Sequence, residues 1–261
     1  MEKEKPVINI TDGAAIPVRK DIGLFSAWRI AFFGALVVLA YLLIFRPDPY
    51  LQILKFVPDG ILVTFEVTFA SIVFAMVLGL LTGMGRIAKN RFINALASTY
   101  VEVVRGIPLL VQLFYIYYAL GRFVRVPDMV AAILAMSFCY GAYMGEVFRA
   151  GIESIDKGQT EAARSLGFNP TQTMFYVILP QAWRTILPPV GNEFIALLKD
   201  TSLVSILAVA DLLRRGREFA SETFTYFETY TMIALIYLII TLMLSKLVSI
   251  MEEKLRYYER H

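Results

Sequence analysis

Residues able to catalyse a reaction are scarce in this chain of 261 residues. Its one histidine is His261, and its one cysteine, Cys139, stands in an apolar run. A serine-histidine triad or a histidine-ligated metal requires a histidine within the fold, and a disulfide framework requires paired cysteines. The chain also lacks the phosphate-binding loop G-x-x-x-x-G-K-[ST]. Three of its glycines are closely spaced, but the lysine that the motif requires does not follow them: Gly79, Gly83 and Gly85. We therefore predict no enzymatic activity, no ATP hydrolysis and no metal site in this chain.

Polar residues inside apolar stretches are more informative, because an ionisable side chain there costs about 2.5–3.5 kcal/mol on insertion scales. Five of them are candidates for a solute pathway: Gln112, Glu146, Asn192, Glu193 and Glu66. Four more are candidates for a gate or for structural ion pairs: Glu102 with Arg105, and Lys199 with Asp200. Plainer interpretations stay open, since Glu146 could pair with Arg149 three residues further on and Gln112 could form an interhelical hydrogen bond. Structural roles also stay open for Glu66 and for the four candidates in the fifth stretch: Asn192, Glu193, Lys199 and Asp200.

Apolar stretches must position these residues. The chain is 57% hydrophobic, whereas soluble domains average about 45–50%. Six stretches approach the roughly 20 residues that cross a bilayer, and they predict helices because lipid cannot satisfy open backbone groups: 27–45, 58–83, 95–120, 128–148, 186–213 and 228–250. A signal peptide is an alternative for the first stretch. Its long polar leader and the following Arg46-Pro47-Asp48-Pro49, which is no cleavage site, favour a retained helix.

The distribution of lysine and arginine predicts the topology. Most of these residues fall on one side if the tails 1–26 and 251–261 are both cytoplasmic, as the positive-inside rule requires. The cluster from Arg214 to Arg217 falls on the other side and weakens this bias. Because the basic residues stand mostly between apolar runs, a nucleic-acid surface is not expected.

A long polar loop, 149–185, lies on the cytoplasmic side in this topology. Helix formers predict a first short helix over 159–166, with Thr160 as a possible cap, and Gly167 is suited to end it. Asn169 and Pro170 start a second helix, which Pro180 is predicted to stop. A loop of this length usually carries function.

The loop resembles the EAA loop of ABC importer permeases. The matching residues are Glu161, Ala162, Ala163, Gly167, Leu179 and Pro180, with Val177 where the family usually has isoleucine. Further stretches resemble permeases for polar amino acids of the histidine, glutamine, arginine and glutamate type: 103–112, 146–152, 157–159, 192–193 and 198–203. The resemblance covers about residues 58–258.

This resemblance implies an all-α membrane bundle with the type I importer core of five helices in 58–250, plus an extra transmembrane helix at 27–45. It implies a bacterial inner-membrane subunit that works by alternating access and imports polar amino acids delivered by an extracytoplasmic binding protein. It also implies a second permease chain, taken as identical in a homodimer, and two ATPase subunits that bind ATP and Mg²⁺. The six loop residues named above would couple the permease to the ATPase.

Two other functions deserve comparison. A secondary transporter or channel that works alone would also contain intramembrane carboxylates, but it would have no need of a loop that docks an ATPase. An intramembrane enzyme would need a nucleophile paired with a base, and no histidine is placed to act as that base.

Overall fold

The computed structural model describes residues 26–124 and 126–257, which are helical with short connections. The elements are α1 (Ala27–Phe45), α2 (Pro47–Phe56), α3 (Pro58–Arg86), α4 (Arg91–Gly106), α5 (Leu109–Phe123), α6 (Asp128–Glu153), α7 (Lys157–Ser165), α8 (Pro170–Gln172), the π-helix η2 (Thr173–Ile178), α9 (Leu179–Asp200), the 3₁₀ helix η3 (Thr201–Leu207), α10 (Leu212–Thr223) and α11 (Tyr226–Tyr257). The all-α prediction is confirmed. The predicted tails lie outside the described residues, except for residues 26 and 251–257.

Within the described residues, four helices are long and apolar enough to span a membrane: α1, α3, α6 and α11. They coincide with four of the predicted stretches. The stretch predicted at 95–120 is instead the pair α4 and α5, bent by 109° and counted as a fifth span if the pair is one span. The bend follows from Pro108, since the preceding residue Ile107 takes the extended backbone that a following proline favours.

The stretch predicted at 186–213 is three elements rather than one helix. Helix α9 begins earlier, at Leu179, and ends at Asp200. It contains polar residues and is not among the four helices that are apolar enough to span a membrane. The chain then forms η3 and turns at Ala208, whose φ of 66° is left-handed. Asp211 caps α10 by accepting hydrogen bonds from the backbone of Arg214 at 3.0 Å and Leu213 at 3.2 Å.

The centre of the molecule is the packing of α3 against α6. Gly79 lets the two backbones approach so closely that a Cβ placed there would lie 2.3 Å from the Cβ of Met144. Large buried side chains continue this core along α6 and onto α9: Met136, Tyr140, Met144, Phe148, Ile186 and Leu197. Burial of this apolar surface fixes the position of α9 relative to α3 and α6.

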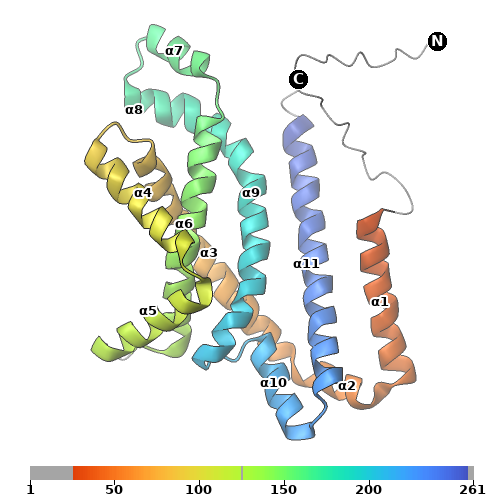
Figure 1. The fold of residues 1–261 in the computed structure, drawn as a ribbon. Helices are drawn as coiled ribbons and strands as arrows, with labels where there is room; N and C mark the ends of the chain where they lie inside the picture. The colour runs from red at the N-terminus through yellow and green to blue at the C-terminus, as the bar shows by residue number, and fades with distance from the viewer. Residues whose placement is uncertain (1–25, 125, 258–261) are drawn as a thin grey trace, which may run out of the picture.

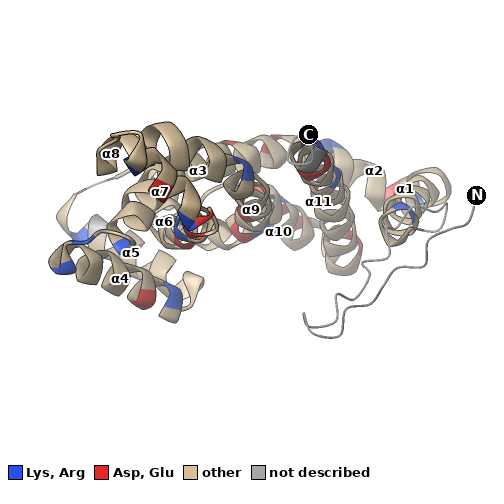
Figure 2. Ribbon diagram, turned by 90° about the horizontal axis from the view of Figure 1, so that it is seen from above, with Lys and Arg blue, Asp and Glu red and all other residues tan. Residues whose placement is uncertain are grey.

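The helices form an elongated row rather than a closed bundle. Helices α4 and α5 lie at one end of the row, α3, α6 and α9 in the middle, and α11 and α1 at the other end (Figures 1 and 2). Helix α1 is attached to α11, where Trp28 donates a hydrogen bond from its indole nitrogen to the carbonyl of Leu242 at 2.8 Å. Helices α7 and α8 lie at the opposite end of the molecule from α2 and α10 (Figure 1).

The polar loop forms helices as predicted, but its first helix has a different cap. Asp156, not Thr160, caps the first helix, because its carboxylate accepts the N–H of Gly158 at 2.7 Å. Gly167 ends this part of the loop with a φ of 87°, as expected for a glycine after a helix. The N–H of Phe168 donates back to the carbonyl of Ala163 at 3.1 Å, which closes the turn.

Pro180 does not stop the second helix, contrary to the sequence prediction. A capping box between Asn169 and Gln172 starts α8, and the chain stays helical through η2 into α9. The N–H of Leu179 donates to the carbonyl of Met174, five residues back. Pro180 therefore stands where the wider π register ends, and its missing N–H falls at a change of hydrogen-bond pattern that α9 tolerates.

Candidate functional site

The coupling residues predicted from the sequence gather at one end of the molecule, on α7, the turn after it and the start of α9. Glu161, Ala162 and Gly167 are exposed, whereas Ala163 is buried and Leu179 is half-buried. Large apolar side chains are also exposed around them: Leu166, Phe168, Phe175 and Tyr176. An exposed apolar patch at a polar end of a protein is typical of a protein contact surface.

Gln181 links the two arms of this surface, and the sequence analysis missed it. Its amide nitrogen donates to the side-chain oxygen of Gln159 on α7 at 3.1 Å. It also donates to the carbonyl of Val177 within η2 at 2.9 Å. The signal in the sequence was a glutamine directly after Pro180, at the point where the helix loses a backbone donor.

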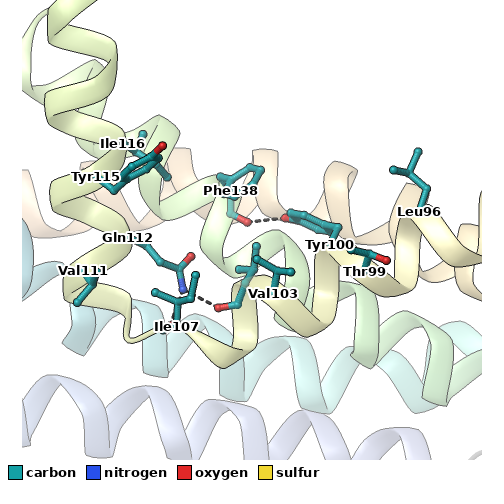
Figure 3. Close-up of a pocket in the computed structure, with 11 residues that line it drawn as sticks. Leu96, Thr99, Tyr100, Val103, Ile107, Val111, Gln112, Tyr115, Ile116 and Phe138 are labelled. Atoms are coloured by element: carbon teal, nitrogen blue, oxygen red, sulfur yellow. Dashed lines mark hydrogen bonds between the residues drawn. The ribbon is translucent and has the colours of Figure 1, made fainter.

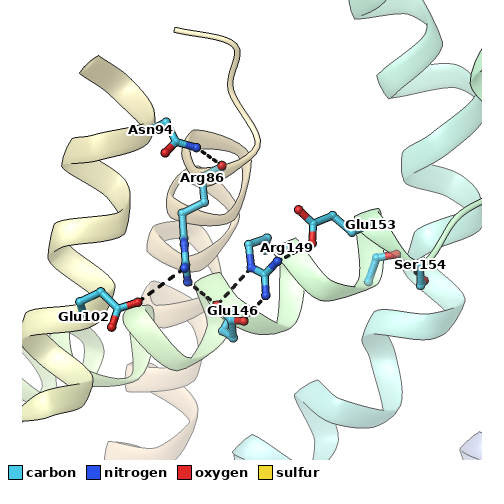
Figure 4. A network of polar contacts seen from close by, with 8 residues as sticks. Arg86, Asn94, Glu102, Glu146, Arg149, Glu153 and Ser154 are labelled. Carbon is cyan, nitrogen blue, oxygen red and sulfur yellow. Dashed lines mark hydrogen bonds and ion pairs between the residues drawn. The ribbon is translucent and has the colours of Figure 1, made fainter. Parts of the chain in front are cut away.

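A network of ion pairs joins α3, α4 and α6 near this end (Figure 4). Glu146 accepts from Arg86 of α3 and from Arg149, whose Nε lies 3.2 Å from the carboxylate. Arg86 also lies 3.7 Å from Glu102 of α4. Glu146 is thus a structural ion-pair residue here, as its plainer interpretation held. Arg86 was missed because it is 60 residues distant in the sequence.

The predicted pair of Glu102 with Arg105 is not formed. Glu102 reaches Arg86 instead, and the guanidinium of Arg105 lies 5.6 Å from the centre of the Tyr143 ring. Both side chains stand on α4, but they turn towards different neighbours on α3 and α6. The side chain of Arg105 therefore points from α4 towards α6.

Gln112 supports the break between α4 and α5 (Figure 3). Its amide nitrogen donates to the carbonyls of Val104 at 2.6 Å and Ile107 at 2.7 Å, and its oxygen accepts from Cys139 at 2.9 Å. These bonds satisfy carbonyls near the break at Pro108. Gln112 is buried and borders an apolar cavity of about 520 Å³. Its amide is therefore fully used within the protein, which favours the structural interpretation.

We expect Gln112→Leu to destabilise the permease, because it leaves the carbonyls of Val104 and Ile107 without their donor. An unsatisfied buried group costs about 1–3 kcal/mol. Thermal unfolding of the detergent-purified protein, followed by tryptophan fluorescence, should show a clearly lower midpoint. Val111→Ala, at an exposed position of the same helix, is the control and should unfold as wild type does. Equal midpoints for both variants would contradict this role.

A chain of side-chain contacts runs from Arg105 on α4 across α6 to Asp200 at the end of α9. Tyr143 packs on Tyr140 with ring centres 5.6 Å apart, and the Tyr140 hydroxyl donates to Asp200 at 2.7 Å. Asp200 thus accepts a hydrogen bond from Tyr140, whereas Lys199 is exposed. Glu193, half-buried on α9, lies in the neighbourhood of Arg105 and Asp200.

Several charged or polar side chains within these helices remain exposed: Glu66, Glu102, Arg105, Asn192 and Lys199. Phe69 on α3 contacts Phe194 on α9 with ring centres 5.0 Å apart, so the surfaces that carry Glu66 and Glu193 adjoin. Exposed charges at these positions are too costly for a lipid contact. They require either water or another protein chain.

Similarity to known proteins identifies the family of this chain. The sequence pattern of the family described as "binding-protein-dependent transport system inner membrane component" matches residues 75–257. The chain belongs to this family. It is similar to the L-cystine transport system permease protein TcyB of Bacillus subtilis (strain 168), with 41% identity over 201 residues that cover 76% of this chain and 86% of the relative. It is also similar to the glutamine transport system permease protein GlnP of Escherichia coli (strain K12), with 37% identity over 201 residues that cover 76% of this chain and 92% of the relative.

Solved structures are also similar to this chain. A crystal structure of an amino acid ABC transporter with histidines matches with a TM-score of 0.73 and 42% identity, over 78% of this chain and 97% of that chain. The MetNI methionine ABC transporter in an inward-facing conformation matches with a TM-score of 0.68 but only 20% identity, over 80% of this chain and 98% of that chain, and shows a shared fold. Helices α1 and α2 precede the region that the family pattern matches.

As a member of this family, the chain is the inner-membrane permease subunit of a binding-protein-dependent ABC importer, and ATP hydrolysis belongs to a separate subunit. The family and the fold predicted from the EAA loop are confirmed. The alternative of a transporter that works alone is not favoured, since members of this family depend on a binding protein.

Proposed function

We propose that this permease imports a polar amino acid across the bacterial inner membrane by alternating access. Relatives support this substrate class, because they include permeases named for L-cystine and for glutamine. The observation that carries the proposal is the polar lining of α3, α4 and α9. Arg105 can hold a carboxylate, and Glu193 can hold an ammonium group, so one face offers partners for both ends of an amino acid.

Glu66, Asn192 and Glu193 are the residues that we assign to this pathway, together with Arg105 as the partner of the substrate carboxylate. Gln112 and Glu146 are left out of it, because their side chains already bond to other protein groups. Lys199 and Glu102 are also exposed and are proposed as gate residues. A second, identical permease chain would cover these residues and enclose a water-filled path, in the two-fold symmetry that most homodimers have.

We assign ATPase docking to the coupling residues: Glu161, Ala162, Ala163, Gly167, Leu179 and Pro180. Two ATPase subunits would bind ATP and Mg²⁺ and hold these helices at the cytoplasmic face. The start of α1 and the end of α11 point towards the same end as α7 and α8 (Figure 1), which supports cytoplasmic termini. The binding protein would then reach the opposite end, where α2 and α10 lie.

Reconstitution with the ATPase and the binding protein tests this function. Uptake and stimulated ATP hydrolysis are measured over a panel of amino acids in lipid vesicles. We expect one polar amino acid to stimulate both. Glu193→Gln should raise the concentration for half-maximal uptake by about tenfold, the effect of losing one charge-assisted hydrogen bond. Glu253→Gln, exposed near the end of α11, is the control. A panel without any stimulating amino acid would contradict the substrate class, and an unchanged Glu193→Gln would contradict the pathway assignment.

A further inference from the structure

Helix α2 precedes the matched family region and lies at the end opposite the coupling surface (Figure 1). It has one apolar face, because Tyr50, Ile53 and the following Val57 are buried at helical spacing. Leu51 and Lys55 on its other face are exposed. A ten-residue helix is too short to be stable by itself, so its position depends on what the buried face contacts.

That face packs against α10 and α11. Tyr50, Ile53 and Val57 form one buried cluster with apolar residues of these two helices: Leu212, Phe219, Met232, Ile233 and Ile236. Phe56 adds a ring contact, with its centre 5.5 Å from that of Phe219. The guanidinium of Arg215 on α10 lies 6.0 Å from the centre of the Phe56 ring.

The start of α3 holds α10 by polar contacts. Arg215 pairs with Asp59, and the N–H of Leu212 donates to the hydroxyl of Thr64 at 3.1 Å. Gly60 permits this approach, because a Cβ at that position would lie 2.9 Å from the carbonyl oxygen of Asp211. Helix α10 is therefore held by apolar contacts from α2 and by polar contacts from α3.

Helix α10 also follows closely on the pathway helix. Only η3 and residues 208–211 separate Asp200, at the end of α9, from the first residue of α10. Residues Arg217, Glu222 and Phe224, on or directly after α10, remain exposed at this end of the molecule. A displacement of α10 by a contact at this end would thus move the end of α9, because the connection between the two helices is short.

We propose that α2 is a brace that fixes α10, and through η3 the end of α9, so that engagement of the binding protein at this end is transmitted to the ATPase. This inference rests on the proposed function for its partners. Ile53, Phe56 and Phe219 are then positioning residues: they touch no substrate, but they set the place of the helix that connects to the pathway.

Ile53→Ala tests the brace in the complete transporter reconstituted with its ATPase and binding protein. Basal ATP hydrolysis should match wild type, whereas stimulation by the binding protein should fall by about tenfold. Amide hydrogen exchange over residues 212–223 should accelerate by about tenfold or more, because α10 loses part of its packing. Leu51→Ala removes an exposed leucine from the same helix and should leave both measurements unchanged.

Wild-type exchange of α10 or wild-type stimulation in Ile53→Ala would overturn the brace. If the Ile53→Ala complex cannot be purified, Phe56→Leu, Phe219→Leu and their double variant replace it. Their effects on α10 exchange should then be non-additive, and additive effects would overturn the inference. The exchange measurement needs neither substrate nor binding protein. A wild-type transporter that no amino acid stimulates would therefore count against the proposed function and leave the α10 measurement as an independent test.

Discussion

Replacing Gly167 by valine is expected to abolish transport while leaving the permease folded and inserted. Gly167 has a φ of 87°, and a β-branched residue is a severe outlier there. No atom lies within 4 Å of the Cβ position, so the strain comes from the backbone alone. The turn must then change shape, which shifts α7 relative to η2 and displaces the surface proposed to dock the ATPase. The core of α3 and α6 is not touched.

Uptake and ATP hydrolysis in vesicles measure this effect. We expect Gly167→Val to lose uptake by about a hundredfold, as a displaced catalytic or coupling contact commonly does, with near wild-type yield in the membrane. Gly167→Asn is the matched control, because asparagine tolerates a positive φ better than other side chains. It should retain most of the transport. Wild-type uptake by the valine variant would refute the coupling assignment.

Replacing Gly79 by valine should have the opposite signature, with loss of the folded protein rather than of coupling. A Cβ at Gly79 would lie 2.3 Å from the Cβ of Met144 and 2.8 Å from its carbonyl carbon. Because a backbone atom is involved, no change of rotamer removes the clash, and α3 must move away from α6. Overpacking of a core typically costs about 1–3 kcal/mol and more where backbone must shift.

Yield after detergent extraction and the thermal unfolding midpoint report this loss. Gly79→Val should give little monodisperse protein. Gly34→Val on α1 is the control, because no atom lies within 4 Å of its Cβ position, and it should behave as wild type. A Gly79→Val protein that unfolds at the wild-type temperature would show that the close approach of α3 and α6 is not required.

Local patterns carried most of what the sequence could predict. Gly167 and the helix start at Asn169 and Pro170 were recognisable because turns and helix starts depend on adjacent residues. The span at 58–83 was recognisable from hydropathy alone. The partner of Glu146 was not, because Arg86 approaches it only when α3 packs on α6. The same holds for Gln112, whose partners are set by the break at Pro108.

The errors have a common physical cause. Pro180 and the stretch at 186–213 were judged by local rules for helix ends and for hydropathy, but tertiary packing decided both. Buried residues such as Ile186 and Leu197 hold α9 in place despite its prolines and polar side chains. Asp211 starts a new helix where the hydropathy of the stretch suggested continuity.

The helical path through Pro180 also has a mechanical consequence. From Pro170 to Asp200 the chain has no non-helical joint. The path is bent rather than straight, because the segment of α8 and η2 lies at a steep angle to α9 (Figure 1). One end carries the surface proposed to meet the ATPase, and the other carries Glu193 and Asp200. A displacement of the short arm by the ATPase would therefore pass to α9 directly, because no flexible loop between the two arms can absorb it.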